Sequence, residues 1–519
     1  MQSSLTSLRP YTLAPGEVDL ATLRAIYQGE LALSLDAAAC EVIERAQRTI
    51  ADILATGEVV YGINTGFGKL ANTRIPVKRL AELQRNLVLS HSVGTGTPLE
   101  DNVVRLVMAC KVISLARGHS GIRLAVVRAM LDLYNAGIMP CIPAKGSVGA
   151  SGDLAPLAHM SLMLIGEGQV RVKGRLMSAV EGLALVGLTP FELEPKEGLA
   201  LLNGTQVSTA LALAGLFGAE RCFGAGLVAG ALSLEAIKGS AKPYDPRIHH
   251  ARGQIGQIAV AQSVAAMLAG SRILESHVHC GRVQDPYSIR CVPQVMGACL
   301  DNLNYAARTL CIEANAASDN PLVFTDSGEV ISGGNFHAEP VAFAADIIAL
   351  AVAEIGAISE RRLSLLLDTG LSGLPPFLIQ EGGVNSGFMI AQVTAAALAS
   401  ENKSLAHPAS VDSLPTSANQ EDHVSMATFG ARRLMDMCFN TSVVVGIEAM
   451  AAAQGIEFNR PLQSSAILEQ QWHAIRQRVA FLERDRLLAP DIEAMRLWVA
   501  ESSLPQDVQS LLPSYPTPL

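Results

Sequence analysis

The chain has 519 residues, too many for one ordinary core, so its length predicts two to four domains or one large architecture extended by oligomerisation. Apolar residues are abundant and charged residues few for a soluble protein, which indicates either a membrane or extensive burial between subunits. The net charge is −9 and no basic tract is present, so nucleic acid is not an expected partner.

The apolar residues form no uninterrupted run near the ~20 residues that a membrane-spanning helix needs. The best candidate begins at Val341 and contains Asp346 and Glu354. We therefore expect no membrane partner and favour burial between subunits. The N-terminus has no apolar core of signal-peptide length, and the nine cysteines form no CxxC pair. Both features are typical of a cytoplasmic protein with reduced thiols.

Helical periodicity dominates the chain and predicts helices over Asp101–Arg117, Ile122–Tyr134, Leu154–Ile165, Thr205–Ile237, Val292–Ala316, Val341–Leu367, Ile390–Ser404, Ser425–Ala453 and Ala466–Leu482. The helix from Val341 would be ~40 Å long, and its first two-thirds is apolar on nearly every face, as in the centre of a helix bundle. Two hairpins are predicted, over Val170–Met177 and Leu322–Ser332. A soft boundary near residue 205 separates an N-terminal region (1–205) from a region of long helices (206–519).

A glycine-rich stretch, GSVGASGDLAP at residues 146–156, precedes the helix predicted from Leu154. One interpretation is a helix entry capped by Asp153. A phosphate-binding loop would need the lysine of GxxxxGK[ST], and a GxSxG nucleophile would need glycine in place of Asp153. A further interpretation is cyclisation, in which the nitrogen of Gly152 attacks the carbonyl of Ala150 and loss of water turns Ser151 into an exocyclic methylene.

Eight motifs in family order resemble those of the aromatic amino acid ammonia-lyases, the family of histidine, phenylalanine and tyrosine ammonia-lyases and related aminomutases. They are YGINTGFG (61–68), NLVLSHSVGTG (86–96), GSVGASGDLAPLAHM (146–160), LLNGTQ (201–206), QDPYSIRC (284–291), EANAASDNP (313–321), GGNFHAEP (333–340) and TSANQEDHVSM (416–426). The resemblance implies a mainly α fold, with a long central helix bundle like that of fumarase and aspartase, a smaller N-terminal region and few short strands. It also implies that Ala150, Ser151 and Gly152 form 4-methylidene-imidazol-5-one (MIO), with no external cofactor and no metal.

The activity implied by the resemblance is loss of ammonia from an α-amino acid, with the MIO as the electrophile that captures the amine. Tyr61 matches the base that removes the β-proton, and its pKa must then fall below the ordinary value of about 10. Arg290 matches the group that binds the substrate carboxylate through two parallel hydrogen bonds. Tyr287, three residues earlier, would lie beside Arg290 on one helical turn and against the MIO. Without the resemblance, Tyr61 also fits a packing tyrosine and Arg290 a surface ion pair.

The resemblance assigns supporting roles to other polar and aromatic residues. Asn203 is expected to hydrogen-bond the MIO carbonyl or the substrate. Phe336 is expected to pack against the prosthetic group, with Gln284 and Gln420 as polar supports and Asn335 in the same set of loops.

Two cues bear on the substrate. Ser90-His91 after NLVL is similar to the histidine ammonia-lyases, and Glu421 in NQEDH offers a carboxylate to an imidazole N–H. A carboxylate buried against a phenyl ring would be costly. Both cues favour L-histidine, with urocanate as product and a role in histidine breakdown. Tyrosine or phenylalanine ammonia-lyase and aminomutase activity remain alternatives, and His91 also fits a core histidine bonded to backbone.

Two other classes of function fit parts of the sequence. His249-His250 and HVHC (277–280) suggest a metal site, but adjacent helical histidines point apart and HVHC needs ligands from elsewhere. A non-catalytic helical scaffold leaves Ser151, Tyr61 and Arg290 unexplained. The resemblance further implies a homotetramer whose active sites are shared between subunits.

Overall fold

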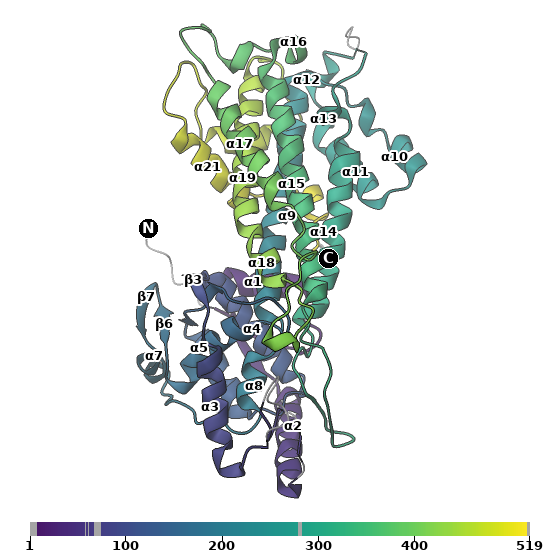
Figure 1. Cartoon of the computed structure of the whole chain (residues 1–519). Coiled ribbons are helices and arrows are strands. Elements are labelled where there is room, and N and C mark those ends of the chain that lie inside the picture. The colour runs from purple at the N-terminus through teal and green to yellow at the C-terminus, as the bar shows by residue number, and fades with distance from the viewer. Residues whose placement is uncertain (1–7, 58, 61, 67–73, 279–282, 516–519) are drawn as a thin grey trace. The chain divides into compact units, whose positions relative to one another are not determined.

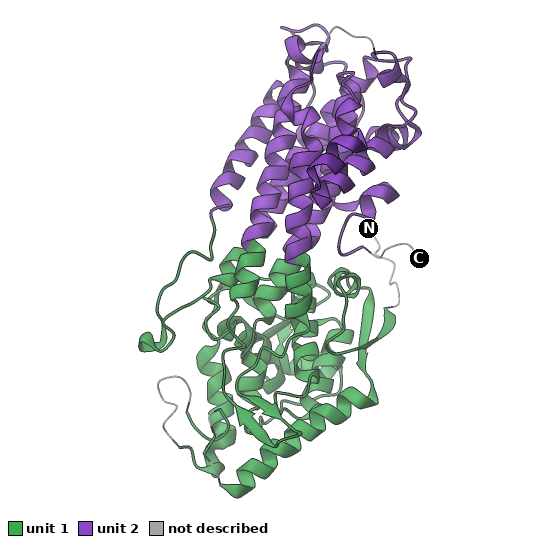
Figure 2. Ribbon diagram, turned by 90° about the vertical axis from the view of Figure 1, so that its right-hand side faces the viewer, with its two compact units in different colours: residues 1–214, 307–345, 408–432 green, residues 215–306, 346–407, 433–519 purple. Residues whose placement is uncertain are grey.

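A computed structural model describes residues 8–57, 59–60, 62–66, 74–278 and 283–515 (Figure 1). The described chain is mainly helical with a few short strands, which confirms the predicted fold class. It divides into two compact units (Figure 2). Unit 1 consists of Met1–Ala214, Ala307–Ala345 and Pro408–Arg432, and unit 2 of Gly215–Ala306, Asp346–His407 and Arg433–Leu519.

Neither unit is continuous in the sequence. Three helices begin in one unit and end in the other, namely α9 (Gln206–Ala236), α14 (Val292–Ala314) and α15 (Glu339–Leu367). The compact units therefore differ from the two continuous regions, 1–205 and 206–519, because the chain returns twice to unit 1. The functional division at residue 205 stays a prediction.

Unit 1 contains all the described strands, in four small sheets. They are β1 (Arg9–Leu13) parallel to β2 (Leu31–Leu35), β3 (Thr95–Pro98) with β5 (Pro143–Lys145), β4 (Ile138–Pro140) with β6 (Gln169–Val172) and β7 (Arg175–Ser178), and β8 (Leu322–Phe324) with β9 (Glu329–Ile331). The β6–β7 and β8–β9 pairs confirm the two predicted hairpins. Val172 pairs with Arg175, so that hairpin turns at Lys173-Gly174.

Helices make up more of unit 1 than strands do. They are α1 (Leu20–Gln28), α2 (Ala37–Thr56), α3 (Leu80–His91), α4 (Asp101–Ala116), α5 (Leu124–Asn135), α6 (Leu154–Leu162), α7 (Ala179–Leu185), α8 (Glu197–Leu202) and α18 (Ala427–Arg432). The predicted helices do not include α1, α2, α3, α7 or α8. The signals for α2 are the Asp36 N-cap, which accepts from the nitrogen of Ala39, and apolar residues at helical spacing from Ala39 to Ile50.

Unit 2 is a set of long helices running side by side (Figure 1, Figure 2). Besides parts of α9, α14 and α15 it contains α10 (Pro246–Arg252), α11 (Ile255–Leu268), α12 (Arg272–Glu275), α13 (Tyr287–Arg290), α16 (Thr369–Ser372), α17 (Met389–Leu405), α19 (Leu434–Glu457), α20 (Ala466–Arg476), α21 (Ala489–Glu501) and α22 (Gln506–Gln509). Small residues allow close packing, since a Cβ at Gly455 would stand 2.8 Å from the Cβ of Ala236.

Most predicted helix ends lie within two residues of the observed ones. Two differ more. The helix predicted over Ser425–Ala453 is two helices, α18 and α19, and α19 extends to Glu457. The helix predicted to Leu482 ends at Arg476.

Three helical stretches have the length and hydropathy of a membrane span: Gln206–Ala236, Glu339–Leu367 and Ala427–Glu457. The second of these includes the segment from Val341, the best candidate in the sequence, and one or two charges within an apolar helix leave its mean hydropathy high. Of their most apolar windows, 89%, 67% and 83% respectively is buried inside the protein. That no membrane is a partner stays a prediction.

Candidate active site

Unit 1 contains a cavity of about 1150 Å³. Residues from the glycine-rich stretch, the C-terminal half of α3 and the segment 417–423 line it together. Seven of the residues singled out from the sequence are among its lining: His91, Ala150, Ser151, Asn203, Phe336, Gln420 and Glu421. Its volume is ample for an amino acid.

The Ala150-Ser151-Gly152 tripeptide is held against the loop that follows α8. Gly152 forms a parallel bridge with Gly204, and its φ of +73° lies in the left-handed region. A Cβ at Gly152 would stand 2.2 Å from the carbonyl oxygen of Gly204. Glycine is therefore required at this position both for its backbone conformation and for its close contact.

Asp153 occupies the position before α6, but its side chain makes no capping hydrogen bond. The predicted helix cap is therefore wrong. The fully buried carboxylate accepts hydrogen bonds from Ser147 and Thr428 at Oδ1, and from the nitrogen and hydroxyl of Ser208 at Oδ2. Tertiary partners outcompete the local cap, and Asp153 links the tripeptide loop to α9 and α18.

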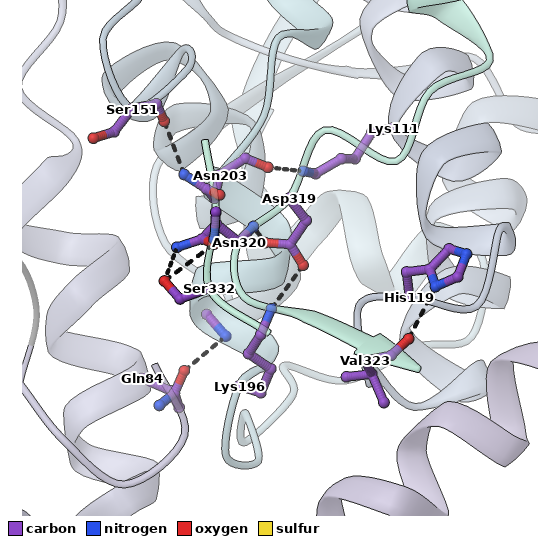
Figure 3. A network of polar contacts seen from close by, with 12 residues as sticks. Gln84, Lys111, His119, Ser151, Lys196, Asn203, Asp319, Asn320, Val323 and Ser332 are labelled. Atoms are coloured by element: carbon purple, nitrogen blue, oxygen red, sulfur yellow. Dashed lines mark hydrogen bonds and ion pairs between the residues drawn. The ribbon is translucent and has the colours of Figure 1, made fainter. Parts of the chain in front are cut away.

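Asn203 and Glu421 approach Ser151 from separate segments. The Asn203 side-chain amide donates to the carbonyl oxygen of Ser151 at 2.8 Å (Figure 3). The Ser151 hydroxyl donates to Oε1 of Glu421 at 2.7 Å, and the Thr416 hydroxyl donates to Oε2 at 2.7 Å. Glu421 is thus fixed beside the serine side chain. The sequence offered no signal for Thr416 except its place five residues before Glu421.

His91 ends α3 at the wall of the cavity. Its Nδ1 lies 2.8 Å from the carbonyl oxygen of Leu87. A carbonyl only accepts, so Nδ1 is assigned the proton, and in the neutral ring Nε2 is then an acceptor. The sequence left two roles open for His91, a hydrogen bond to the backbone or a contact with the ligand. The two roles are compatible here, because the backbone bond uses Nδ1 and the ligand contact would use Nε2.

The remaining predicted site residues do not lie in unit 1 or are not described. Tyr61 lies outside the described residues. Gln284, Tyr287 and Arg290 belong to unit 2, where Tyr287 and Arg290 form the ends of α13. The Arg290 guanidinium lies over the Tyr287 ring, 4.6 Å from its centroid, which confirms that one helical turn brings them together. The buried Nε of Arg290 has no hydrogen-bond partner among the described residues.

The histidine pairs do not form a metal site in the part of the chain that is described. No group of three or more His, Cys, Asp or Glu side chains there could hold an ion. His249 is bonded instead to the carbonyl of Pro243 at 3.0 Å and to the amide of Gln257 at 2.9 Å. His279 and Cys280 lie outside the described residues.

A family model described as aromatic amino acid lyase matches residues 18–477. The chain belongs to the aromatic amino acid lyase family. Two relatives of this lyase are histidine ammonia-lyases: one from Paracidovorax citrulli is 71% identical, with 98% of this chain and 100% of the relative covered. One from Aromatoleum aromaticum is 61% identical over 93% and 92% of the two chains.

Solved structures of similar proteins have the same fold as this lyase. The histidine ammonia-lyase of Trypanosoma cruzi has a TM-score of 0.90 at 40% identity and covers 97% of this chain and 96% of its own. The tyrosine aminomutase of Streptomyces globisporus also has a TM-score of 0.90, at 34% identity, covering 95% and 97%. These matches identify the lyase as most like the histidine ammonia-lyases.

Proposed function

We propose that this chain is a histidine ammonia-lyase that eliminates ammonia from L-histidine to give trans-urocanate. The single observation that carries the proposal is the meeting of Ser151, Asn203 and Glu421 at a cavity that His91 also lines. The identity with histidine ammonia-lyases over nearly the whole chain supports it.

Ring formation at Ala150-Ser151-Gly152 is supported by how the tripeptide is held. The three glycines of this stretch, Gly146, Gly149 and Gly152, all have positive φ, which gives the loop a turn that other residues rarely adopt. Asp153 donates its backbone N–H to the carbonyl of Gly204 at 2.7 Å. The turn before Gly152 and the hydrogen bond after it thus restrict its backbone before the ring-closing bond forms, which favours an intramolecular reaction. The residues present fit the MIO.

When formed, the MIO supplies an electrophile that binds the substrate amine. The other tasks fall to side chains. Asn203 donates a hydrogen bond to the Ser151 carbonyl oxygen, where negative charge is stabilised. Phe336 packs at the cavity wall, and Gln420 offers an amide there. Tyr61 removes the β-proton.

Recognition of the imidazole side chain falls to Glu421 and His91. The carboxylate accepts one N–H of the protonated substrate imidazole, and the second ring N–H donates to His91 Nε2. A phenyl ring would leave both groups without partners, and a site built for hydrogen bonds rejects such an analogue by ~10⁴-fold or more. The substrate carboxylate is bound by Arg290, whose guanidinium can give two parallel hydrogen bonds, with Gln284 and Tyr287 as further contacts.

A homotetramer with shared active sites, in the cytoplasm, completes the proposal. Large apolar side chains are half exposed along two long helices, Phe343 and Leu350 on α15 and Ile390 and Val393 on α17. Such surface is typical of an interface between subunits. Light scattering at micromolar concentration tests it, and fully active monomers would contradict it.

Tyrosine or phenylalanine ammonia-lyase activity, or an aminomutase outcome, is the second candidate, favoured by the structural match to a tyrosine aminomutase. The deciding experiment follows ultraviolet absorbance of the purified protein with L-histidine, L-tyrosine or L-phenylalanine in separate cuvettes, with Ser151→Ala as control. We expect a conjugated product from histidine alone, absent in the control. Turnover of tyrosine or phenylalanine instead would overturn the assignment of the pocket, and activity retained by Ser151→Ala would overturn the MIO.

A further inference from the structure

Lys111 is a buried titratable residue with no part in the reaction as proposed. It lies in α4, where thirteen of the sixteen residues are buried, and only 1% of Lys111 is exposed. Burying an amine costs free energy unless specific partners compensate it. Burial lowers the pKa of Lys111 to about 7, against the opposing effect of Asp319 and Asp153 and with a further lowering by Lys196.

The two hydrogen-bond acceptors of Lys111 lie at the two ends of the loop that holds the tripeptide, one on Asn203 after α8 and one on Gln206 at the start of α9. Its Nζ donates to the carbonyl oxygen of Asn203 at 2.7 Å (Figure 3). It also donates to Oε1 of Gln206 at 3.3 Å. Both acceptors are uncharged, so the lysine is not balanced here by a direct carboxylate partner. These two hydrogen bonds fix the positions of both ends of the segment 203–206.

That loop makes close contacts with the tripeptide. The Asn203 amide binds the Ser151 carbonyl, and the Gly204 carbonyl accepts from the nitrogen of Asp153. A Cβ on Gly204 would stand 2.4 Å from Oε1 of Gln206, so the Gly204 backbone packs closely against the Gln206 side chain as well as against Gly152. A small shift of residues 203–204 therefore moves Ser151 and Gly152 as well.

A second layer of buried contacts supports the lysine and the loop. Gln206 donates to the Ser318 hydroxyl at 2.9 Å, and Lys196 pairs with Asp319 at 2.7 Å with both side chains almost fully buried. Thr205 donates to Glu313, whose pKa is raised by burial. Lys111 is the member of this network that reaches the Asn203 carbonyl directly.

We propose that Lys111 is a positioning residue for formation of the prosthetic group: it fixes the Asn203–Gly204 backbone, and through it the Ser151–Gly152 backbone, in the arrangement that ring closure needs. This inference rests on the proposed function. Its effect lies in the maturation of the chain, before any substrate binds.

The reaction that Lys111 assists loses two water molecules and needs no co-reactant. The nitrogen of Gly152 forms a bond to the carbonyl carbon of Ala150. The Ala150 oxygen leaves as water with the amide protons of Gly152 and Ser151, and a C=N bond remains between Ala150 and Ser151. The Ser151 hydroxyl then leaves with the Cα proton of the same residue as a second water.

The test compares the full chain with Lys111→Met, which removes the donor but retains the length of the side chain. The control is Val112→Ala, on the same helix and equally buried, which leaves a small cavity without touching the loop. Chains are synthesised in a short pulse, and the mass of the peptide containing residues 146–156 is measured by mass spectrometry over time. Circular dichroism and thermal unfolding verify that each variant is folded.

We expect the two-water mass loss to appear at least tenfold more slowly in Lys111→Met than in the chain of native sequence. In Val112→Ala it should appear at the native rate. A merely structural lysine would lower the unfolding temperature without changing the rate of maturation in folded chains, and an unchanged rate overturns the proposal. If Lys111→Met does not fold, the smaller Lys111→Leu decides by the same criterion, because it also removes the Nζ donor to the Asn203 carbonyl. Absence of the mass loss in the unmodified chain would instead overturn the proposed function.

Discussion

Gly152 lies with its backbone against that of Gly204, with room for a hydrogen but not for a methyl group: a Cβ would stand 2.2 Å from the carbonyl oxygen of Gly204. The contact joins the segment that would form the ring to the loop after α8, 52 residues further along the chain. Its consequences for maturation and activity are open to direct test.

Gly152→Ala is expected to abolish both the two-water mass loss and turnover, because the methyl group must displace the Gly204 backbone. Gly174→Ala is the matched control, since Gly174 has a φ of +77° but no neighbouring atom within 4 Å of the place that a Cβ would occupy. That control should lose about 1 kcal/mol of stability from its backbone conformation alone and mature normally. Mass spectrometry and the absorbance assay measure both. Equal maturation of the two variants would contradict the steric argument.

Glu421→Gln is expected to reduce kcat/KM for L-histidine by about tenfold to a hundredfold, because a hydrogen bond to a charged group contributes about 1.5–3 kcal/mol. The residual turnover of L-phenylalanine, which the unaltered site holds ~10⁴-fold or more below that of L-histidine, should not fall further. Asp422→Asn, the neighbouring carboxylate at the same cavity, should change either value less than twofold. Steady-state kinetics with both amino acids provides the measurement. An equal loss of kcat/KM for both amino acids would mean that Glu421 does not recognise the imidazole.

Glu448→Gln is expected to destabilise the protein by about 3–5 kcal/mol, because it leaves the buried Arg362 without its charge partner. The Arg362 Nη2 donates to Oε2 of Glu448 at 2.8 Å, and neither side chain is exposed. The control is Glu493→Gln, whose ion pair with Arg496 is at the surface and is worth no more than about 1 kcal/mol. Denaturant midpoints of the two variants should differ accordingly. Similar midpoints would show that the buried pair is dispensable.

Glu235→Gln is expected to stabilise the protein increasingly as pH rises. Burial raises the pKa of Glu235 to about 7, against the hydrogen bond from the Ser271 hydroxyl. The folded state therefore holds its proton more tightly than the unfolded state, so the unmodified chain loses stability as pH rises from about 4.5 to about 7, by at most about 1.4 kcal/mol per pH unit. Glutamine cannot ionise and avoids this loss. Denaturant midpoints at pH 5 and pH 8 measure it, and a pH-independent difference would refute the assignment.

Features that depend on neighbouring residues could be predicted from the sequence. The hairpin turn at Lys173-Gly174 and the contact of Tyr287 with Arg290 follow from local geometry, because each spans a single turn of backbone. Apolar periodicity likewise predicted the long helices to within a few residues at most ends. The interpretation of Asp153 as a helix cap, one of those considered from the sequence, is wrong. Ser208 and Thr428, distant in sequence, bind the carboxylate that a local rule assigns to the helix.

By itself, the sequence determined the helical class, the glycine-rich tripeptide and the family motifs, since these depend on residue types and spacing along the chain. Only the tertiary structure decided that Glu421 binds Ser151 across 270 residues, and that Lys111 holds the loop carrying Asn203. No periodicity encodes such contacts. They arise because burying the apolar helices forces polar groups from distant segments into the same interior, where each must find a hydrogen-bond partner.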